Sequence, residues 1–473
     1  MELNIVGTVE KVNGKELCYS NFVEKYLSKN EPVVITGLMD DWKACRDWVF
    51  DDGKPNLQFI SSTFGNSKVQ VADCGSREFT EQKRSDMSVS EFIAKSVDFS
   101  STNHDNPSTN NLKGKTLLYL KDWHFVKEYP EYTAYTTPPF FLDDWLNLYL
   151  DHYHIHEDPD TYQKRDNISC SDYRFVYMGA KGTWTPFHAD VFRSYSWSAN
   201  VCGKKQWYFL SPGQHHLAFD RNMKNSVYDI FEDVSKTTFP NFNKTTWLEC
   251  TQDKNEMIFV PSGWFHQVHN LEDTISINHN WFNAYNLSWV WDLLLRDYKE
   301  AKEYIEDIKD ICDDFEGICQ RNLAANTGMN FYDFFKFSVR FSFANIVLLC
   351  HLAKNSDDVK WCSSVKAKNL IYNLESVKDI AIKMNFTCLS GNHNISLDFR
   401  SILEDPVFLE LCCQLEKTYD FIHDQCGKKK IVMEDLVEVG ICKLFNTVVC
   451  NPEDLVVFID HILQNLILSP CKG

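Results

Sequence analysis

The stretch "TWTPFHADVFRSYSWSANVCGKKQWYFL", residues 183 to 210, places His188 and Asp190 two residues apart, just before a run of alternating apolar and polar residues. Alternation with a period of two predicts a β-strand with one buried face. The pair alone is a weak signal, because 15 histidines and 66 acidic residues in 473 give about two such pairs by chance. A third partner is needed before the pair indicates a metal site.

A second stretch, "NEMIFVPSGWFHQVHNLEDTISINHNWF", residues 255 to 282, supplies that partner. The run "MIFVP" predicts a strand, a Pro-Ser-Gly bend reverses the chain, and His266 opens the next strand. Two antiparallel strands of one barrel can then aim His188, Asp190 and His266 at one point. The sequence therefore predicts a three-residue metal site.

The ligand types favour iron over zinc. Two histidines and one carboxylate on one face of an octahedron are the ligands of non-haem Fe(II) oxygenases. Catalytic zinc uses the same types with the spacing His-Glu-x-x-His on a helix, and that spacing is absent. The alternative for His266 taken alone is a core histidine packed beside Trp264.

A denser histidine cluster, "DHYHIHEDPD" at residues 151 to 160, is the competing metal candidate. On a strand, its histidines would share one face, with Asp158 two residues beyond the last. No strand scaffold surrounds the cluster, and it leads into Pro159. We interpret it as a solvated turn. The histidines are His152, His154 and His156.

The strand-like segments predict an α+β chain in two parts. Six short apolar segments between residues 171 and 282, separated by turn residues, are typical of a sandwich or barrel. "PVVIT" and "LLYLKDW" predict two earlier strands, and the polar residues 96 to 116 predict a long loop. Beyond about residue 285 the periodicity is helical. We expect a domain over residues 1 to 285 and an all-α domain over residues 286 to 473.

Composition excludes several classes of protein. A hydrophobic fraction of 44% supports a packed core, and the net charge of −18 argues against direct nucleic-acid binding. Seventeen cysteines without a Cys-x-x-Cys motif predict neither a disulfide framework nor a zinc cluster. No apolar stretch is expected to span a membrane, since "FANIVLLCHLA" is too short. We expect a cytoplasmic or nuclear protein.

At this point the residues resemble those of the jumonji C (JmjC) oxygenases. The resemblance runs from "EPVVITGLMDDW" through "LLYLKDW" and "TPFHAD" to "VPSGWFHQVHNLEDTISINHNWF". It implies a double-stranded β-helix, which is a cupin-like jelly-roll barrel, over residues 1 to 285. It also implies Fe(II), 2-oxoglutarate and O2 as cofactors, with His188, Asp190 and His266 as the iron ligands.

The same resemblance implies a co-substrate site. The distal carboxylate of 2-oxoglutarate needs a buried cation and a hydroxyl, and Lys205 and Tyr119 match the family's lysine and tyrosine. Thr185 matches its threonine, and Asn278 stands where relatives often carry a polar residue. The alternatives without a role in binding are a solvated strand residue for Lys205 and a core aromatic for Tyr119. Many relatives carry an asparagine near Ser198, where this chain offers only that serine or its neighbour Ser196.

The resemblance favours protein hydroxylation and leaves two alternatives open. Hydroxylation of a lysine in the translation release factor, and so a role in translation termination, is implied by one branch of the family. Histone lysine or arginine demethylation would use the same machinery, although no reader module or zinc cluster is visible. A non-catalytic JmjC binding module would have no physical need for the full ligand set. The helical domain leaves open a homodimer interface or a platform for the protein substrate.

Overall fold

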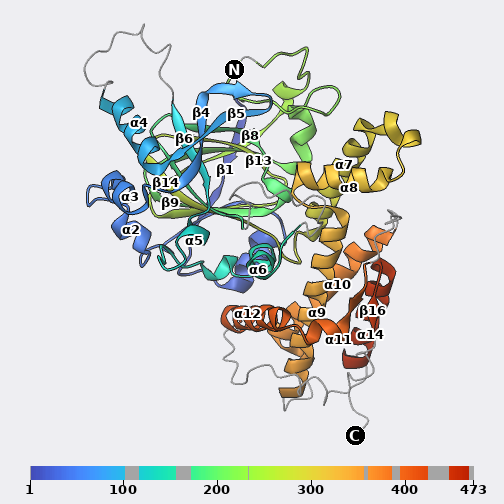
Figure 1. Cartoon of the computed structure of the whole chain (residues 1–473). Helices are drawn as coiled ribbons and strands as arrows, with labels where there is room; N and C mark the ends of the chain where they lie inside the picture. The colour runs from blue at the N-terminus through green and yellow to red at the C-terminus, as the bar shows by residue number, and fades with distance from the viewer. Residues whose placement is uncertain are drawn as a thin grey trace. The chain divides into compact units, whose positions relative to one another are not determined.

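The computed structural model describes residues 2–101, 117–155, 172–232, 234–355, 361–385, 395–423 and 447–467. The chain divides into two compact units, one formed by residues 1–138 and 173–280, the other by 139–172 and 281–473. Figure 1 shows the large sheets in the first unit and mainly helices in the second. The boundary expected near residue 285 stays a prediction.

Two sheets build the first unit. The smaller has the strand order β1-β11-β10-β13-β8, and the larger β2-β3-β12-β9-β14-β7-β6-β4-β5. This confirms the predicted barrel-like fold, including all six segments expected between residues 171 and 282. The strands of the smaller sheet are β1 (Ile5–Thr8), β8 (Trp184–His188), β10 (Lys205–Leu210), β11 (Trp247–Gln252) and β13 (Phe265–Asn270). Those of the larger are β2 (Glu10–Asn13), β3 (Val33–Thr36), β4 (Lys68–Glu78), β5 (Glu81–Ser88), β6 (Leu118–Trp123), β7 (Arg174–Gly179), β9 (Tyr195–Cys202), β12 (Glu256–Val260) and β14 (Thr274–Trp281).

An apolar core fills part of the interior of the first unit, next to the candidate site. It includes Val34 from β3, Trp207 and Phe209 from β10, Ile258 from β12 and Val268 from β13, all buried. These side chains alternate along their strands with residues of the opposite face, as the period of two requires. Other positions in the barrel interior are polar, and these polar residues form the site described below.

Helices and helical turns flank the strands of this unit. Helix α4 continues to Ser101 and so enters the stretch for which the sequence predicts a loop, while residues 102–116 lie outside the described residues. The elements are α1 (Tyr19–Phe22), η1 (Val23–Leu27), α2 (Lys43–Asp47), α3 (Leu57–Phe64), α4 (Val89–Ser101), α5 (Phe125–Glu128), η3 (Val191–Arg193), η4 (Pro212–Ala218) and η5 (Phe242–Lys244).

The second unit is mainly helical, as predicted for the C-terminal part of the chain. Its long helix α9 packs against α10, α12 and α14. Trp145 of α6 stacks on Phe341 of α9 with ring centroids 4.5 Å apart. The elements are η2 (Pro139–Phe141), α6 (Trp145–His152), α7 (Leu287–Tyr304), η6 (Glu306–Ile311), α8 (Phe315–Thr327), α9 (Phe331–Asn355), η7 (Trp361–Ser363), α10 (Val365–Asn385), β15 (Leu397–Asp398), α11 (Phe399–Leu403), α12 (Pro406–Ile422), β16 (Val448–Val449) and α14 (Pro452–Ile467).

Helix α9 corrects one expectation. Residues Phe331–Lys354 are long and apolar enough to cross a membrane by length and composition, so the prediction that no stretch reaches that length is wrong. The prediction considered only "FANIVLLCHLA", but the Phe-rich segment before it extends the apolar run. Within an apolar 18-residue window of this stretch, 83% of the residues are buried inside the fold. Its composition is that of a helix at the centre of a packed core.

Candidate functional site

The two histidines predicted to bind metal face each other across neighbouring strands. In the antiparallel pair of β13 and β8, His266 lies directly opposite His188, and their ring centroids are 4.4 Å apart. The register shifts between this pair and the next, where Val268 lies opposite Thr185. The extra residue that this bulge gives β8 brings Thr185 and His188 to one face despite their odd spacing.

Asp190 completes the group just beyond the end of β8. One ligand atom from each of His188, Asp190 and His266 lies within 4.8 Å of the others. After Asp190 the chain turns through Phe192 and Arg193, whose φ angles of 55° and 51° are unusual for residues with a Cβ. Within the described ranges, no other group of three metal-binding side chains lies this close together. The structure thus brings the three predicted residues together.

Hydrogen bonds leave the correct ring nitrogens available. Nδ1 of His188 donates to the carbonyl of Pro186 (2.8 Å), and Nδ1 of His266 donates to that of Trp264 (3.1 Å). Because a carbonyl only accepts, each Nε2 keeps its lone pair for a metal. Burial, with the neighbouring His266, lowers the pKa of His188 to about 3. The ring is therefore neutral, as a metal ligand must be.

The serine that orders the carboxylate is Ser196. Its Oγ donates to Oδ2 of Asp190 at 2.7 Å, whereas the buried Oγ of Ser198 has no hydrogen-bond partner. Of the two serines that the sequence left open, only Ser196 therefore contacts Asp190 in the structure.

Ser196→Ala is expected to weaken metal binding ~10- to 100-fold, the usual effect of losing a group that orients a ligand. Ser198→Ala should leave metal affinity nearly unchanged, because its hydroxyl does not contact Asp190. Titration of both purified variants with Mn(II) measures the difference. Equal losses in the two variants would contradict this assignment.

Lys205 lies in the barrel interior, away from Lys204. Its side chain is only 2% exposed, and its Nζ donates to Oγ of Ser276 on β14 at 2.7 Å. Lys204 is half-exposed and pairs with Asp253. Burial, with a contribution from Lys121, lowers the pKa of Lys205 to about 7. The bland alternative of a solvated strand lysine is wrong for Lys205 and applies to Lys204.

The remaining candidates also line the interior. Tyr119 is buried on β6 opposite Gly179 of β7, where a Cβ would lie 2.6 Å from the tyrosine ring, so glycine makes room for it. Thr185 is half-buried on the inner face of β8. Oδ1 of the buried Asn278 has no hydrogen-bond partner, and neither does Oγ of Ser198. Since buried polar atoms normally have partners, a polar ligand fits this space.

Sequence reasoning missed Ser276 and Lys121. Ser276 is two residues before Asn278 on β14, and Lys121 is two residues after Tyr119 on β6. The period of two within "TISINHN" and "LYLKDW" was the signal that could have found them, because it puts each residue on the face of its predicted neighbour. Of the competing cluster, His152 ends α6, and His156 and Asp158 lie outside the described residues. Among the described residues, the metal-binding group contains no member of this cluster.

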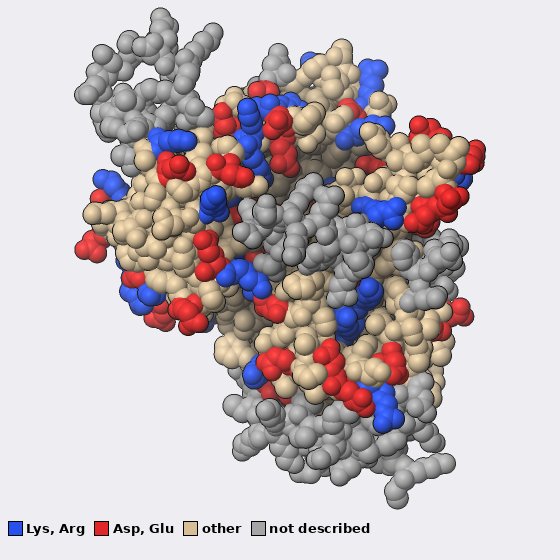
Figure 2. Space-filling view, in the orientation of Figure 1, with Lys and Arg blue, Asp and Glu red and all other residues tan. Residues whose placement is uncertain are grey.

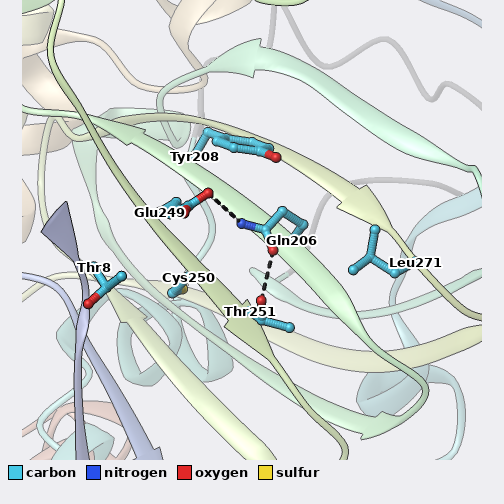
Figure 3. Close-up of a pocket in the computed structure, with 7 residues that line it drawn as sticks. All are labelled: Thr8, Gln206, Tyr208, Glu249, Cys250, Thr251 and Leu271. Atoms are coloured by element: carbon cyan, nitrogen blue, oxygen red, sulfur yellow. Dashed lines mark hydrogen bonds between the residues drawn. The ribbon is translucent and has the colours of Figure 1, made fainter. Parts of the chain in front are cut away.

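A separate surface pocket lies on the outer face of the same strands. Figure 3 shows Gln206, the neighbour of Lys205, bonded to Glu249 (3.2 Å) and Thr251 (2.8 Å). The cavity, of about 380 Å³, is lined by polar and apolar residues, among which Cys250 also belongs to the buried core. They are Thr8, Gln206, Tyr208, Glu249, Cys250, Thr251 and Leu271.

The low pKa of Lys205 predicts how co-substrate affinity depends on pH. A carboxylate binds the protonated lysine, so above about pH 7 binding must include proton uptake. Affinity for 2-oxoglutarate should be highest below pH 7 and fall by up to ~10-fold per pH unit above it. Calorimetric titration of the Mn(II)-loaded protein between pH 6 and 9 measures this trend. An affinity that rises with pH would contradict it.

Comparison with known proteins identifies relatives whose names agree with an iron and 2-oxoglutarate site. Residues 19–286 match the family model of a cupin-like domain. The chain is 57% identical over 465 residues, 98% of each chain, to the arginine-specific demethylase JMJ20 of Arabidopsis thaliana. It is 36% identical to the 2-oxoglutarate and iron-dependent oxygenase JMJD4 of Danio rerio, over 82% of this chain and 83% of that one. It is also 36% identical to the human protein of that name, over 67% and 72%.

Proposed function

Because the chain belongs to the cupin-like JmjC family of 2-oxoglutarate and iron-dependent oxygenases, we propose that it hydroxylates a lysine side chain of a protein, first among candidates the translation release factor. Its cofactors are Fe(II), 2-oxoglutarate and O2. The observation that carries the proposal is the group of His188, Asp190 and His266 inside the barrel, with a buried lysine below it.

Each residue then has a separate task. His188, Asp190 and His266 would hold Fe(II), which with 2-oxoglutarate and O2 supplies the oxidant for a substrate C–H bond. Lys205 would pair with the distal carboxylate of 2-oxoglutarate, with Tyr119 and Thr185 offering hydroxyls beside it. Asn278 and Ser198 would supply the remaining polar contacts. The apolar core below the site keeps bulk water from this side of the reaction.

A lysine substrate agrees with the charge of the chain. The net charge is −18, and Figure 2 shows acidic side chains gathered over the segment labelled α7 and α8 in Figure 1. Opposite charge favours encounter with a basic segment of a partner. No zinc-binding cysteine cluster of the kind appended to many demethylases occurs in the described ranges.

Arginine demethylation is the second candidate, favoured by the relative named an arginine-specific demethylase at 57% identity. Both reactions begin by hydroxylating a carbon. Hydroxylation of a stable side-chain carbon leaves an alcohol, whereas hydroxylation of an N-methyl group releases formaldehyde.

Mass spectrometry with both substrates present distinguishes the candidates. Purified protein with Fe(II) and 2-oxoglutarate under air is offered recombinant release factor and a methylarginine histone peptide. A gain of one oxygen on a release-factor lysine, without formaldehyde, is the expected result. Loss of a methyl group with formaldehyde would make the enzyme a demethylase, and succinate formation without change in either substrate would overturn both assignments. The His266→Ala protein is the control for uncatalysed oxidation.

A further inference from the structure

A second buried lysine lies in the barrel interior. Lys121 on β6 is 6% exposed, and its Nζ is 5.0 Å from the ring centroid of Tyr119. Its ammonium donates to Oε1 of Gln82 at 2.9 Å, and Nε2 of that glutamine donates to the carbonyl of Trp184 at 3.1 Å. Gln82 therefore holds Lys121 against β8, the strand that carries Thr185 and His188.

The backbone fixes the direction of Lys121. The register of β6 against β7 shifts between Leu120 and Trp123, and Asp122 at the shift has a φ of 56°. An ion pair with Arg84 and a hydrogen bond from the hydroxyl of Tyr177 at 2.7 Å hold Asp122 in this strained conformation. Bulges of this kind direct neighbouring side chains into functional sites.

Neither interior lysine has a carboxylate partner. Within the described residues, the ammonium of Lys121 donates to the amide of Gln82 and that of Lys205 to the hydroxyl of Ser276, and no acidic side chain lies within ion-pair distance of either ammonium. Burial lowers the pKa of Lys121 to about 8, and burial together with the charge of Lys121 lowers the pKa of Lys205 to about 7. Two unpaired buried cations are unfavourable, and an anion between them would relieve that cost.

The strand registers place Lys121 near the distal end of the co-substrate site. Tyr119 lies opposite Gly179, which lies opposite Thr274, two residues before the serine that contacts Lys205. Tyr119 and Lys121 share the inner face of β6. Strands β6 and β14 are separated only by β7, so Tyr119 and Lys121 lie on the same part of the nine-stranded sheet as Ser276, whose hydroxyl contacts Lys205.

We propose that Lys121 and Lys205 together bind the distal carboxylate of 2-oxoglutarate, so that this site holds two cations for one carboxylate. The inference rests on the placement of the co-substrate proposed above, and it is independent of which protein is hydroxylated. Two lysines at the distal end would make a dicarboxylate strongly preferred over a 2-oxo acid with one carboxylate.

Calorimetric titration of Mn(II)-loaded protein without oxygen tests the proposal. Lys121→Met is expected to weaken 2-oxoglutarate binding ~10- to 100-fold, the range for one charged hydrogen bond. Binding of 2-oxobutyrate, which lacks the distal carboxylate, should be unchanged. Lys83→Met, which replaces an exposed lysine next to Gln82, is the matched control and should bind both acids normally.

A second variant tests whether misfolding explains a loss of 2-oxoglutarate binding in Lys121→Met. Gln82→Glu keeps the shape of the side chain and offers Lys121 an internal carboxylate, so it should weaken 2-oxoglutarate binding in the same direction as Lys121→Met. Unchanged affinity in both variants, or equal losses for 2-oxoglutarate and 2-oxobutyrate, would overturn the role of Lys121. If Lys205→Met also binds 2-oxoglutarate normally, the placement of the co-substrate itself is wrong.

Discussion

Replacing His266 with alanine is expected to abolish metal binding and turnover together, while replacing His269 on the same strand leaves both intact. His266 faces the interior and meets His188, whereas His269 faces outward and stacks on Trp184 at 5.7 Å. Loss of a direct ligand should exceed the 10- to 100-fold reduction typical of groups that merely orient a ligand. Succinate formation with Fe(II) and titration with Mn(II) measure the two effects.

Comparing the two histidine variants separates the loss of a metal ligand from a loss of folding stability. His269→Ala removes a half-buried ring and a contact with Gln267, so a modest fall in melting temperature is acceptable for it. If His266→Ala retained stoichiometric metal and turnover, the interior group would not be the metal centre. If both variants lost metal equally, the effect would come from disruption of β13.

Lys205→Met should raise the KM for 2-oxoglutarate and its Kd at least ~30-fold. The reason is that the variant removes the buried partner of a carboxylate, a loss of about 2–5 kcal/mol for such pairs. Lys204→Met removes the neighbouring lysine, which is half-exposed and pairs with Asp253 in solvent, and should change neither constant by more than ~3-fold. Steady-state kinetics and calorimetry on both variants check the prediction.

The contrast between adjacent lysines also controls for strand damage, since Lys205 begins β10 and Lys204 directly precedes it. Normal 2-oxoglutarate affinity in Lys205→Met would remove this residue from the site. A large effect of Lys204→Met would instead indicate that the turn before β10 governs binding.

The strands that the sequence predicted are those with clean alternation or a closed apolar run, such as β3, β6 and β14. Strand β8 was not predicted as a strand because Pro186 and the bulge interrupt its pattern, although it carries Thr185 and His188. The grouping of His188 with Asp190 and His266 could be predicted, because two histidines and a carboxylate beside strands of one barrel indicate a metal site. Residue type and spacing carry that information.

Which serine contacts Asp190, and which residue contacts Lys121, could not be predicted in the same way. Ser196 and Ser198 are alike in sequence and share the inner face of β9, and only the position of Asp190 after the bulge decides which serine reaches it. The period of two puts Lys121 on the face of Tyr119, but the burial of its ammonium depends on Gln82, which comes from the hairpin of β4 and β5. Such long-range contacts set the environment of a side chain without leaving a local pattern.

The distribution of the site over both sheets has a consequence for folding. His188, His266 and Lys205 come from the five-stranded sheet, and Tyr119, Ser276 and Asn278 from the nine-stranded one. Neither sheet alone can hold the co-substrate, so its binding is linked to complete closure of the barrel. Free ligand at 100 times its Kd would add about 2.7 kcal/mol to the free energy of unfolding. The resting stability of this fold should therefore follow the cell's supply of 2-oxoglutarate.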